Sequence, residues 1–567
     1  MNKRPRFVLP DTRLVCLFVL TIVLLVSILG GGVSSSLAAQ LSSVIHARTA
    51  STLPIIAPVI SCTQLAQHDF GSVPDAPTSI LSATVVAATS TTPEYCDVKG
   101  YISPQTQFDL ELPTTTYQGR YLQVGCGGFC GAFFDPAPFP SCDAQLGGDF
   151  ALANENTGHV GASQTDGVWA LDDLQLRLEF GYLSEHAMAQ AAKAIITTFY
   201  GQSPRYSYFD GCSSGGQEAL QEAQRYPDDF DGLIAGAAAN IFAPLVAEVQ
   251  AWYARANLDA QGNQILTGDK LPALHDAVMK ACAGVDGLID DPRTCHFDPA
   301  SIQCPSGTDT STCLTPAQVE TVRKLYEGPV DAQGRHLYTG GEAYGSELGW
   351  DKWIVTPPGV VSSAQALAEN YLKYMAFQVG QVGPSLQDWQ FTIAGFNALR
   401  PMGDIYDATN ADLSAFRAHG GKLIIWQGWA DQAIPPFGTP AYYDAVQDRM
   451  GGLQQVQQFA RLFMFPGTAH CGGGYGPSPS DSDMIVPMVS WVEQGIAPDK
   501  IVATQTKGGK GGVPIQVVRT FPVFPYPEQT KYTGQGSIND ANNYVGVMPQ
   551  PLPDDDYNWV GNDLFNA

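Results

Sequence analysis

A serine stands at the centre of a Gly-x-Ser-x-Gly motif near the middle of the chain. The motif, 211–215, follows an apolar stretch at 206–210 and precedes a stretch with helical periodicity at 217–226. A strand that turns this sharply into a helix crowds the backbone, so glycine is needed two positions before and after the central residue. We predict that Ser213 is a nucleophile and that the Ser214 N–H, at the positive end of the helix, stabilises an oxyanion. The alternative is a Gly/Ser turn without chemistry.

A nucleophilic serine needs a histidine as its base and an acidic residue that orients the histidine. In serine hydrolases with this turn, the order along the chain is serine, acid, histidine. Asp431 follows an apolar stretch at 422–426, and His470 lies in a glycine-rich loop after the stretch 458–464. Both loops would lie at the ends of late sheet strands. We predict that His470 is the base and that Asp431 orients it.

Other residues compete for these two roles. His159 lies in an earlier loop between two glycines, where a hydrogen bond to the backbone is its alternative role. Asp404, Asp407 and Asp412 precede the strand at 422–426. We interpret these three aspartates as solvated residues.

Two cysteines adjoin the predicted serine and histidine. Cys212 directly precedes Ser213, and Cys471 directly follows His470. If the serine and histidine touch, the cysteines are also close, and a disulfide between them would clamp the nucleophile to its base. The alternative is that the two cysteines are unrelated.

A glycine-rich loop at 124–131 follows another short apolar stretch, 121–124. It fails the dinucleotide-binding pattern G-x-G-x-x-G because Cys130 occupies the third glycine position. Glycines leave backbone N–H groups accessible, which suits an oxyanion loop. We predict that Gly127 or Gly128 supplies the second oxyanion donor.

Strand-like and helix-like stretches alternate along the chain, which predicts an α/β fold: a doubly wound, mostly parallel sheet with helices on both faces. Between 239 and 411 the chain instead has short amphipathic pieces, turn residues and four cysteines, which suggests an inserted lid domain. The first part of the sheet domain would then span 60–238 and the second part 412–567.

Charge and the N-terminal segment indicate export and exclude one class of partner. The net charge is −25, and lysines and arginines do not cluster beyond the N-terminus, so nucleic acid is not an expected partner. Residues 1–39 have the basic, apolar and small-residue regions of an export signal, cleaved after Ala38 or Ala39. An uncleaved membrane anchor is the alternative. We expect a secreted, extracellular or periplasmic protein. The sequence does not indicate its oligomeric state.

The chain has twelve cysteines, of which Cys16 lies in the apolar run of the signal. Most of the remaining eleven should form disulfides outside a reducing cytoplasm, with one left over. Their spacing does not match a zinc site. The residues alone assign no partner to Cys126, Cys130 or Cys142.

Together these motifs resemble the tannase and feruloyl esterase family of α/β-hydrolases, which includes the hydrolase of mono(2-hydroxyethyl) terephthalate. The resemblance begins at about Cys62 and is strongest at the Cys-Ser-x-Gly-Gly turn and the later His-Cys pair. It implies that Ser213, Asp431 and His470 form a catalytic triad. It also implies the disulfides Cys212–Cys471, Cys62–Cys96, Cys282–Cys295 and Cys304–Cys313.

The family also has a calcium site in its lid, where aspartates and backbone carbonyls bind the ion. The corresponding loop here, 282–292, is shorter and has one aspartate fewer, with Asp286 and Asp290 as the remaining candidate ligands. A polar turn without calcium is the alternative. Gln427 stands where many members have histidine, beside the predicted site.

The predicted reaction is hydrolysis of a bulky aromatic or phenolic ester, feruloyl, galloyl or similar, through an acyl-enzyme and without a catalytic cofactor. One alternative is a serine peptidase with the same triad. The other is a non-catalytic protein that binds cell wall or glycan. Trp429, Ala433 and Ile434 flank Asp431 and are candidate pocket residues, although core packing would explain them equally well.

Overall fold

The computed structural model describes residues 53–89, 92–131, 148–507, 515–550 and 558–566. The predicted export signal and Cys142 lie outside these residues. Among the helices described, none combines the length and apolar character needed to cross a membrane.

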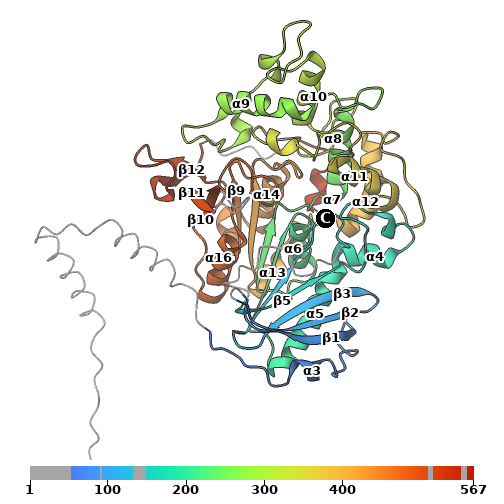
Figure 1. The fold of residues 1–567 in the computed structure, drawn as a ribbon, viewed down its shortest axis with the longest axis vertical. Helices are drawn as coiled ribbons and strands as arrows, with labels where there is room; N and C mark the ends of the chain where they lie inside the picture. Colours follow the sequence, from blue (N-terminus) through green and yellow to red (C-terminus); the bar gives the residue numbers. More distant parts are fainter. Residues whose placement is uncertain (1–52, 90–91, 132–147, 508–514, 551–557, 567) are drawn as a thin grey trace, which may run out of the picture. The chain divides into compact units, whose positions relative to one another are not determined.

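A nine-stranded sheet forms the centre of the described part of the chain (Figure 1). Its strand order is β1-β2-β3-β5-β4-β6-β7-β8-β9. All pairings from β5 to β9 are parallel, whereas β1, β2, β3 and β5 pair antiparallel. The strands are β1 Thr78–Val86, β2 Tyr95–Ile102, β3 Thr106–Pro113, β4 Arg120–Val124, β5 Phe150–Glu155, β6 Tyr206–Cys212, β7 Gly232–Gly236, β8 Lys422–Gly428 and β9 Ala460–Phe465. The predicted mostly parallel sheet is confirmed, and the antiparallel edge is an addition to it.

The central strands are apolar because both of their faces are covered. Every residue of β7 is buried, and only Lys422 of β8 is partly exposed. Alternate residues of a strand point to opposite faces. Thus Leu233 packs in the cluster that contains residues of α5 Ser184–Tyr200 and α6 Ser214–Arg225, whereas Ile234 packs with α16 Asp481–Gln494. This is the two-sided cover expected for a parallel sheet.

The stretch 239–411 is helical and adds no strand to the nine-stranded sheet in the part of the chain that the structure describes. Its ends lie together, because the Ala408 N–H donates to the Asn240 carbonyl at 2.8 Å. Its α-helices are α7 Phe242–Pro244, α8 Ala251–Ala256, α9 Leu271–Cys282, α10 Pro316–Glu327, α11 Ser363–Asn370 and α12 Ile393–Tyr406. The lid remains a prediction as a domain, but the chain enters and leaves this stretch at one place.

Further elements complete the described structure. The remaining α-helices are α3 Cys62–Leu65, α4 Leu174–Leu178, α13 Ser414–His419, α14 Gly438–Met450 and α15 Leu453–Val456. Two small antiparallel sheets pair β10 Ile501–Lys507 with β11 Gln516–Val523, and β12 Gln529–Tyr532 with β13 Tyr544–Val547.

Disulfides join distant parts of the chain. The pairs are Cys62–Cys96, Cys126–Cys130, Cys212–Cys471, Cys282–Cys295 and Cys304–Cys313. Four of them confirm the predicted pairings. The pair Cys126–Cys130, which the residues alone did not assign, closes the glycine-rich loop.

Candidate active site

The turn around Ser213 has the geometry that its glycines indicate. Strand β6 ends at Cys212, and Ser213 has a φ of 65° and a ψ of −121° before α6 begins at Ser214. A positive φ is unusual for a residue with a side chain and marks local strain. A Cβ on Gly211 would collide with the backbone of Gly215, and a Cβ on Gly215 would lie 3.0 Å from the Cys126 carbonyl oxygen, so both positions favour glycine. The Ser213 side chain lines a cavity.

Ser213, His470 and Asp431 form a continuous chain of hydrogen bonds. His470 Nε2 lies 3.0 Å from Ser213 Oγ, and His470 Nδ1 lies 2.9 Å from Asp431 Oδ2. His470 comes from the loop after β9, and Asp431 from the loop after β8. These parallel strands end at the same edge of the sheet, which brings residues distant in sequence together. Both hydrogen bonds form in the His470 tautomer in which Nδ1–H donates to Asp431 and Nε2 accepts from the Ser213 hydroxyl.

The Asp431 carboxylate is fully buried and held by other donors. Its Oδ1 accepts the backbone N–H groups of Ala433 at 2.8 Å and Ile434 at 2.9 Å. Its Oδ2 also accepts from Gln427 Nε2 at 2.8 Å. Gln427, which borders the site as expected, therefore orients the same carboxylate oxygen that faces His470.

The competing residues lie elsewhere. Both ring nitrogens of buried His159 face backbone carbonyls, Nε2 that of Phe129 at 2.8 Å, and burial lowers the pKa of His159 to about 4. Asp407 accepts the Ala243 N–H at 2.7 Å, and Asp412 pairs with Arg449. In the described structure, neither these groups nor exposed Asp404 bonds to His470.

The glycine-rich loop packs directly on the start of α6. The Gly215 N–H donates to the Cys126 carbonyl at 2.8 Å, and Ser214 Oγ donates to the Gly128 carbonyl at 2.6 Å. Within the described residues, the backbone N–H groups of Gly127 and Ser214 have no hydrogen-bond partner. Both residues line the same cavity as Ser213, as does Gly128. Two N–H donors beside a serine hydroxyl can stabilise a developing oxyanion.

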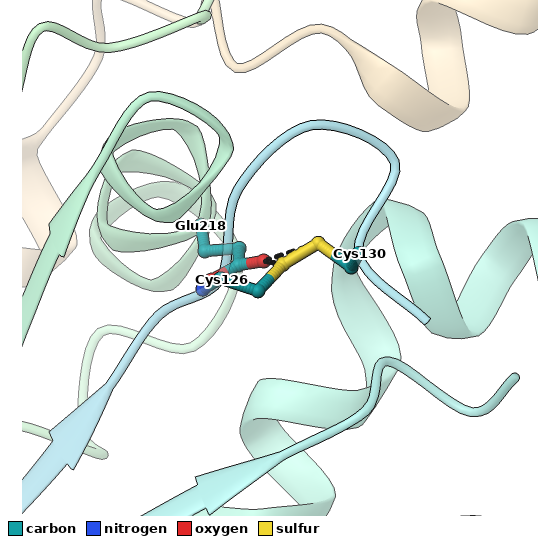
Figure 2. A group of neighbouring side chains, drawn as sticks. All are labelled: Cys126, Cys130 and Glu218. Atoms are coloured by element: carbon teal, nitrogen blue, oxygen red, sulfur yellow. Dashed lines mark hydrogen bonds between the residues drawn. A yellow bond between two sulfur atoms is a disulfide. The ribbon is translucent and has the colours of Figure 1, made fainter. Parts of the chain in front are cut away.

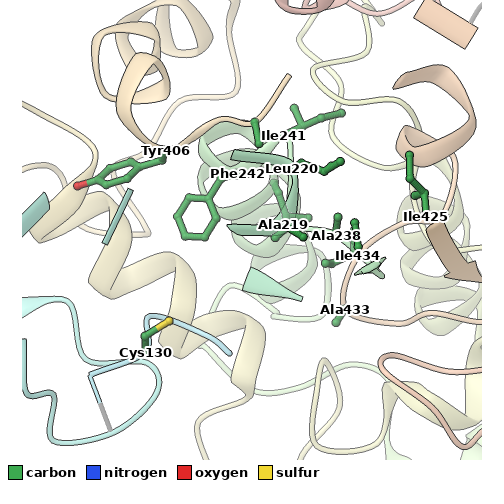
Figure 3. Packing of buried hydrophobic residues seen from close by; sticks show 14 of the residues in the cluster. Cys130, Ala219, Leu220, Ala238, Ile241, Phe242, Tyr406, Ile425, Ala433 and Ile434 are labelled. Atoms are coloured by element: carbon green, nitrogen blue, oxygen red, sulfur yellow. The ribbon is translucent and has the colours of Figure 1, made fainter. Parts of the chain in front are cut away.

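The cavity at Ser213 has a volume of about 380 Å³, enough for a small organic ligand. Its wall includes Phe242, Leu245, Val246, Trp353, Leu367, Ala433 and Ile434, with Gln164, Thr165, Gln250 and Ser363 as polar members. Ala433 and Ile434 thus face the cavity and also belong to the main hydrophobic cluster (Figure 3). Trp429 does not line it, because its ring instead lies 5.1 Å from the Arg293 guanidinium.

Residues that sequence reasoning missed come mostly from the stretch 239–411. The Trp353 ring lies 6.0 Å from the His470 ring, so it forms a wall of the cavity next to His470 and Ser213. No local pattern marks Trp353, because its place depends on how this stretch packs over the sheet. Among the described lining residues there is no lysine or arginine.

The candidate calcium loop does not fit a calcium ion. Arg519 Nη1 donates to the Asp286 carbonyl at 3.0 Å, and its Nη2 lies 3.2 Å from Asp286 Oδ2. Calcium needs six to eight oxygen ligands, and here a guanidinium already occupies two of the oxygens it would take. Asp290 keeps one buried oxygen without a hydrogen-bond partner among the described residues. Burial raises the pKa of Asp290 to about 7.

A second group with metal-binding side chains lies behind the glycine-rich loop. Figure 2 shows Cys126, Cys130 and Glu218 close together, with the two sulfurs joined in a disulfide. A metal would need thiolates, which a disulfide does not offer. Because Glu218 lies on α6 and accepts the Cys126 N–H, the group links the loop to α6.

Comparison with known proteins identifies the family. The family model described as tannase and feruloyl esterase matches residues 88–547. The chain belongs to this family. It is 34% identical over 524 residues to an uncharacterized esterase of Xanthomonas campestris pv. campestris. The match covers 84% of this chain and 88% of that protein. It is also 32% identical over 543 residues to the mono(2-hydroxyethyl) terephthalate hydrolase of Piscinibacter sakaiensis, covering 82% of this chain and 87% of that hydrolase.

A solved relative has the same fold. The crystal structure of feruloyl esterase B from Aspergillus oryzae matches with a TM-score of 0.72 and 27% identity, covering 86% of this chain and all of the other. Membership of the tannase and feruloyl esterase family makes the protein a carboxylic ester hydrolase with a small-molecule ester as substrate. The family resemblance and the enzyme class inferred from sequence are confirmed.

Proposed function

We propose that the protein is a serine esterase that hydrolyses esters of aromatic, phenolic acids through an acyl-enzyme on Ser213. The supporting observation is the hydrogen-bonded chain from Ser213 through His470 to Asp431, with distances of 3.0 and 2.9 Å. A serine hydroxyl next to a neutral imidazole can lose its proton as it attacks a carbonyl carbon.

In the first half of the proposed reaction, Ser213 Oγ bonds to the acyl carbon and its proton passes to His470 Nε2. The carbonyl oxygen becomes an oxyanion, which accepts hydrogen bonds from the N–H groups of Ser214 and Gly127. The bond to the alcohol oxygen then breaks, and the leaving alcohol takes the proton from His470. Buried Asp431 stabilises the imidazolium that forms between these two proton transfers.

In the second half, water replaces the alcohol. His470 takes a proton from the water as its oxygen attacks the acyl carbon of the Ser213 ester. The bond to Ser213 Oγ breaks, the serine recovers its proton from His470, and the acid is released. The protein needs no further group for this cycle, since every proton transfer in both halves uses His470 Nε2.

The walls of the cavity favour a flat, uncharged acyl group. Trp353 and Phe242 offer aromatic surface, and aliphatic side chains make up much of the remaining wall. The absence of lysine and arginine among the described lining residues leaves an acyl carboxylate without a cationic partner, which makes its burial costly. We therefore expect feruloyl or galloyl esters to be better substrates than a monoester of a dicarboxylic acid such as terephthalic acid.

Export belongs to the same proposal. The N-terminal segment has the composition of a signal, and disulfides such as Cys212–Cys471 persist in oxidising compartments. A secreted or periplasmic enzyme would meet phenolic esters outside the cytoplasm.

Purified enzyme with methyl ferulate, methyl gallate and p-nitrophenyl acetate as substrates tests the proposal. Ser213→Ala should abolish turnover of all three and labelling by a fluorophosphonate. The matched control is Ser214→Ala at the neighbouring serine, which keeps its backbone N–H and should still be labelled. Persistent labelling of Ser213→Ala, or wild-type enzyme without activity on any ester, would contradict the proposal.

A further inference from the structure

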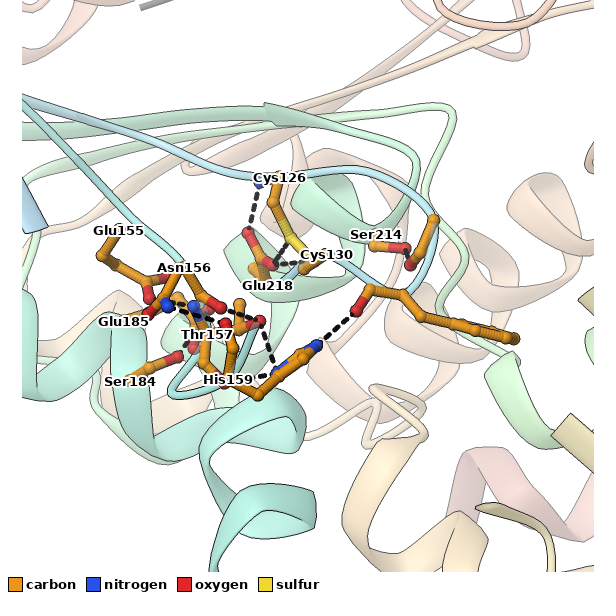
Figure 4. Close-up of a disulfide and its surroundings, with 12 residues drawn as sticks. Cys126, Cys130, Glu155, Asn156, Thr157, His159, Ser184, Glu185, Ser214 and Glu218 are labelled. Carbon is orange, nitrogen blue, oxygen red and sulfur yellow. Dashed lines mark hydrogen bonds between the residues drawn. A yellow bond between two sulfur atoms is a disulfide. The ribbon is translucent and has the colours of Figure 1, made fainter. Parts of the chain in front are cut away.

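Three glutamates meet behind the glycine-rich loop (Figure 4). Glu155 ends β5, Glu185 lies on α5 and Glu218 lies on α6. Beyond the effect of burial, Glu218 and Glu155 both raise the pKa of Glu185, so the three carboxyl groups interact electrostatically. Glu185 and Glu218 are only 2% and 1% exposed, so solvent screens their interaction little.

Glu218 also holds the loop itself. Its Oε2 accepts the backbone N–H of Cys126 at 3.1 Å, and its Oε1 touches the Cys126–Cys130 disulfide (Figure 2). A Cβ on Gly125 would collide with Glu218 Oε2, so the loop and the carboxyl group are packed without space between them. Glu218 lies on the helix that begins directly after Ser213, and it therefore couples the loop to the nucleophile.

Two contacts on Cys126, from Gly215 and from Glu218, fix the orientation of the Gly127 N–H. The carbonyl of Cys126 and the N–H of Gly127 belong to one peptide unit, which is planar and trans, so they point in opposite directions. The carbonyl accepts from the Gly215 N–H at 2.8 Å on the α6 side. The Gly127 N–H is thereby turned away from α6, and Gly127 lines the cavity. On the other side of the Cys126 Cα, Glu218 holds the preceding peptide unit.

We propose that Glu218 is a positioning residue for ester hydrolysis, which holds the oxyanion loop in register with Ser213 through its hydrogen bond to the Cys126 N–H. The inference rests on the proposed serine mechanism. Glu218 touches neither substrate nor reacting atoms, so its effect should fall on kcat rather than on KM. Other bonds to the loop, such as Ser214 Oγ to the Gly128 carbonyl and the Phe129 N–H to the Gln164 carbonyl, do not involve the Cys126 N–H.

The charges around Glu218 give the arrangement a pH dependence. The titratable groups that interact with it are Glu155 from β5, Glu185 from α5 and Glu222 from α6. Beyond them lie Glu179, from the π-helical turn before α5, next to Glu155, and Asp229 and Lys193 next to Glu222. Burial raises the pKa of Glu218 to about 7. Burial, and then the charge of Glu218, raise the pKa of Glu185 well above its usual range.

The sign of the effect follows from these directions. A carboxyl group whose pKa is higher in the folded than in the unfolded protein stabilises the fold at low pH, and this contribution is lost as pH rises through the folded pKa. As the pH rises through about 7, ionisation of Glu218 should therefore place a poorly solvated charge behind the loop and destabilise the fold there. Gln at position 218 keeps an oxygen for the Cys126 N–H and cannot ionise.

The experiment compares kcat and KM for methyl ferulate from pH 6 to pH 9 in wild type, Glu218→Met, Glu218→Gln and Glu222→Met. Glu222 is equally buried on α6, but its carboxyl oxygens have no hydrogen-bond partner among the described residues, so Glu222→Met controls for loss of a buried carboxyl group. Loss of one oxyanion donor costs about 100-fold in kcat, so a misplaced donor in Glu218→Met should cost about 10-fold or more with KM nearly unchanged. Glu218→Gln should keep wild-type kcat at pH 6 and lose less than wild type at pH 9.

Equal kcat in Glu218→Met and Glu222→Met, or a rise in KM as large as the fall in kcat, would overturn the inference. If Glu218→Met does not fold, the Gln variant decides: a pH profile that superimposes on that of wild type also overturns it. Loss of activity in Ser213→Ala alongside either result separates failure of this inference from failure of the serine mechanism.

Discussion

The disulfide between Cys212 and Cys471 should stabilise the protein more than any of the local disulfides and should also support catalysis. It joins residues 259 positions apart, directly beside the serine and the histidine. Cys304–Cys313, by contrast, joins residues 9 positions apart in the stretch 239–411. The two disulfides therefore form a matched pair for a test by Cys→Ser double substitution.

The expected difference in stability follows from the loop that each disulfide closes in the unfolded chain. Loop-closure entropy gives about 5.6 kcal/mol for the Cys212–Cys471 loop and about 2.6 kcal/mol for the Cys304–Cys313 loop. The two small disulfides inside the large loop shorten it only slightly, and the entropy depends on the logarithm of length. Removing Cys212–Cys471 should thus cost about 3 kcal/mol more in free energy of unfolding.

Guanidinium unfolding followed by tryptophan fluorescence would measure the difference, and kcat for methyl ferulate would measure the effect on the site. Cys212→Ser/Cys471→Ser should unfold at a lower denaturant concentration than Cys304→Ser/Cys313→Ser, and it alone should lose kcat, because its cysteines position Ser213 and His470. Equal unfolding midpoints and equal kcat in the two double variants would refute the reasoning.

Four further outcomes follow from single groups. Asp431→Asn should lower kcat about 10⁴-fold with little change in KM, because the histidine loses the partner that orients it; a loss below tenfold in a kinetic assay would argue for another acid. Trp353→Ala should raise KM for methyl ferulate up to about tenfold and leave KM for p-nitrophenyl acetate unchanged, since only the aromatic acyl group uses the ring. Burial raises the pKa of Glu248 to about 8, so the free energy of unfolding should fall as pH rises from 4.5 to 8; Glu248→Gln should remove several kcal/mol of this dependence in pH-dependent denaturation, and an unchanged slope would exclude it. Because Arg519 already pairs with Asp286, EDTA should leave the Tm of the wild-type protein unchanged, whereas a fall of several degrees would reveal a bound calcium ion.

Much of the candidate active site could be predicted from local sequence patterns. The glycines around Ser213 predict its turn because only a residue without a Cβ fits two positions from the serine. Asp431 and His470 could be selected because each follows an apolar stretch that forms a buried parallel strand, β8 or β9. The disulfide Cys212–Cys471 was predictable because its cysteines adjoin residues that were already expected to touch.

Tertiary structure decided the features that depend on contacts between distant segments. The antiparallel edge of β1, β2 and β3 arises from strand pairing, which no local periodicity specifies. Trp353 reaches the cavity only through the packing of the stretch 239–411, and Trp429 turns away to Arg293.

Contacts of charged residues also depended on the tertiary structure. The calcium expectation came from the family resemblance and the loop that contains Asp286 and Asp290, whereas Arg519, more than 200 residues later, contacts the oxygens of Asp286. Glu218 likewise gains its role from contact with Cys126, 92 positions away. The sequence by itself determined which residues are the candidates for catalysis, because the turn around Ser213 and the strands before Asp431 and His470 are encoded locally. Only the folded chain decided which charges, rings and donors surround those groups, because such neighbours are set by packing between segments far apart in sequence.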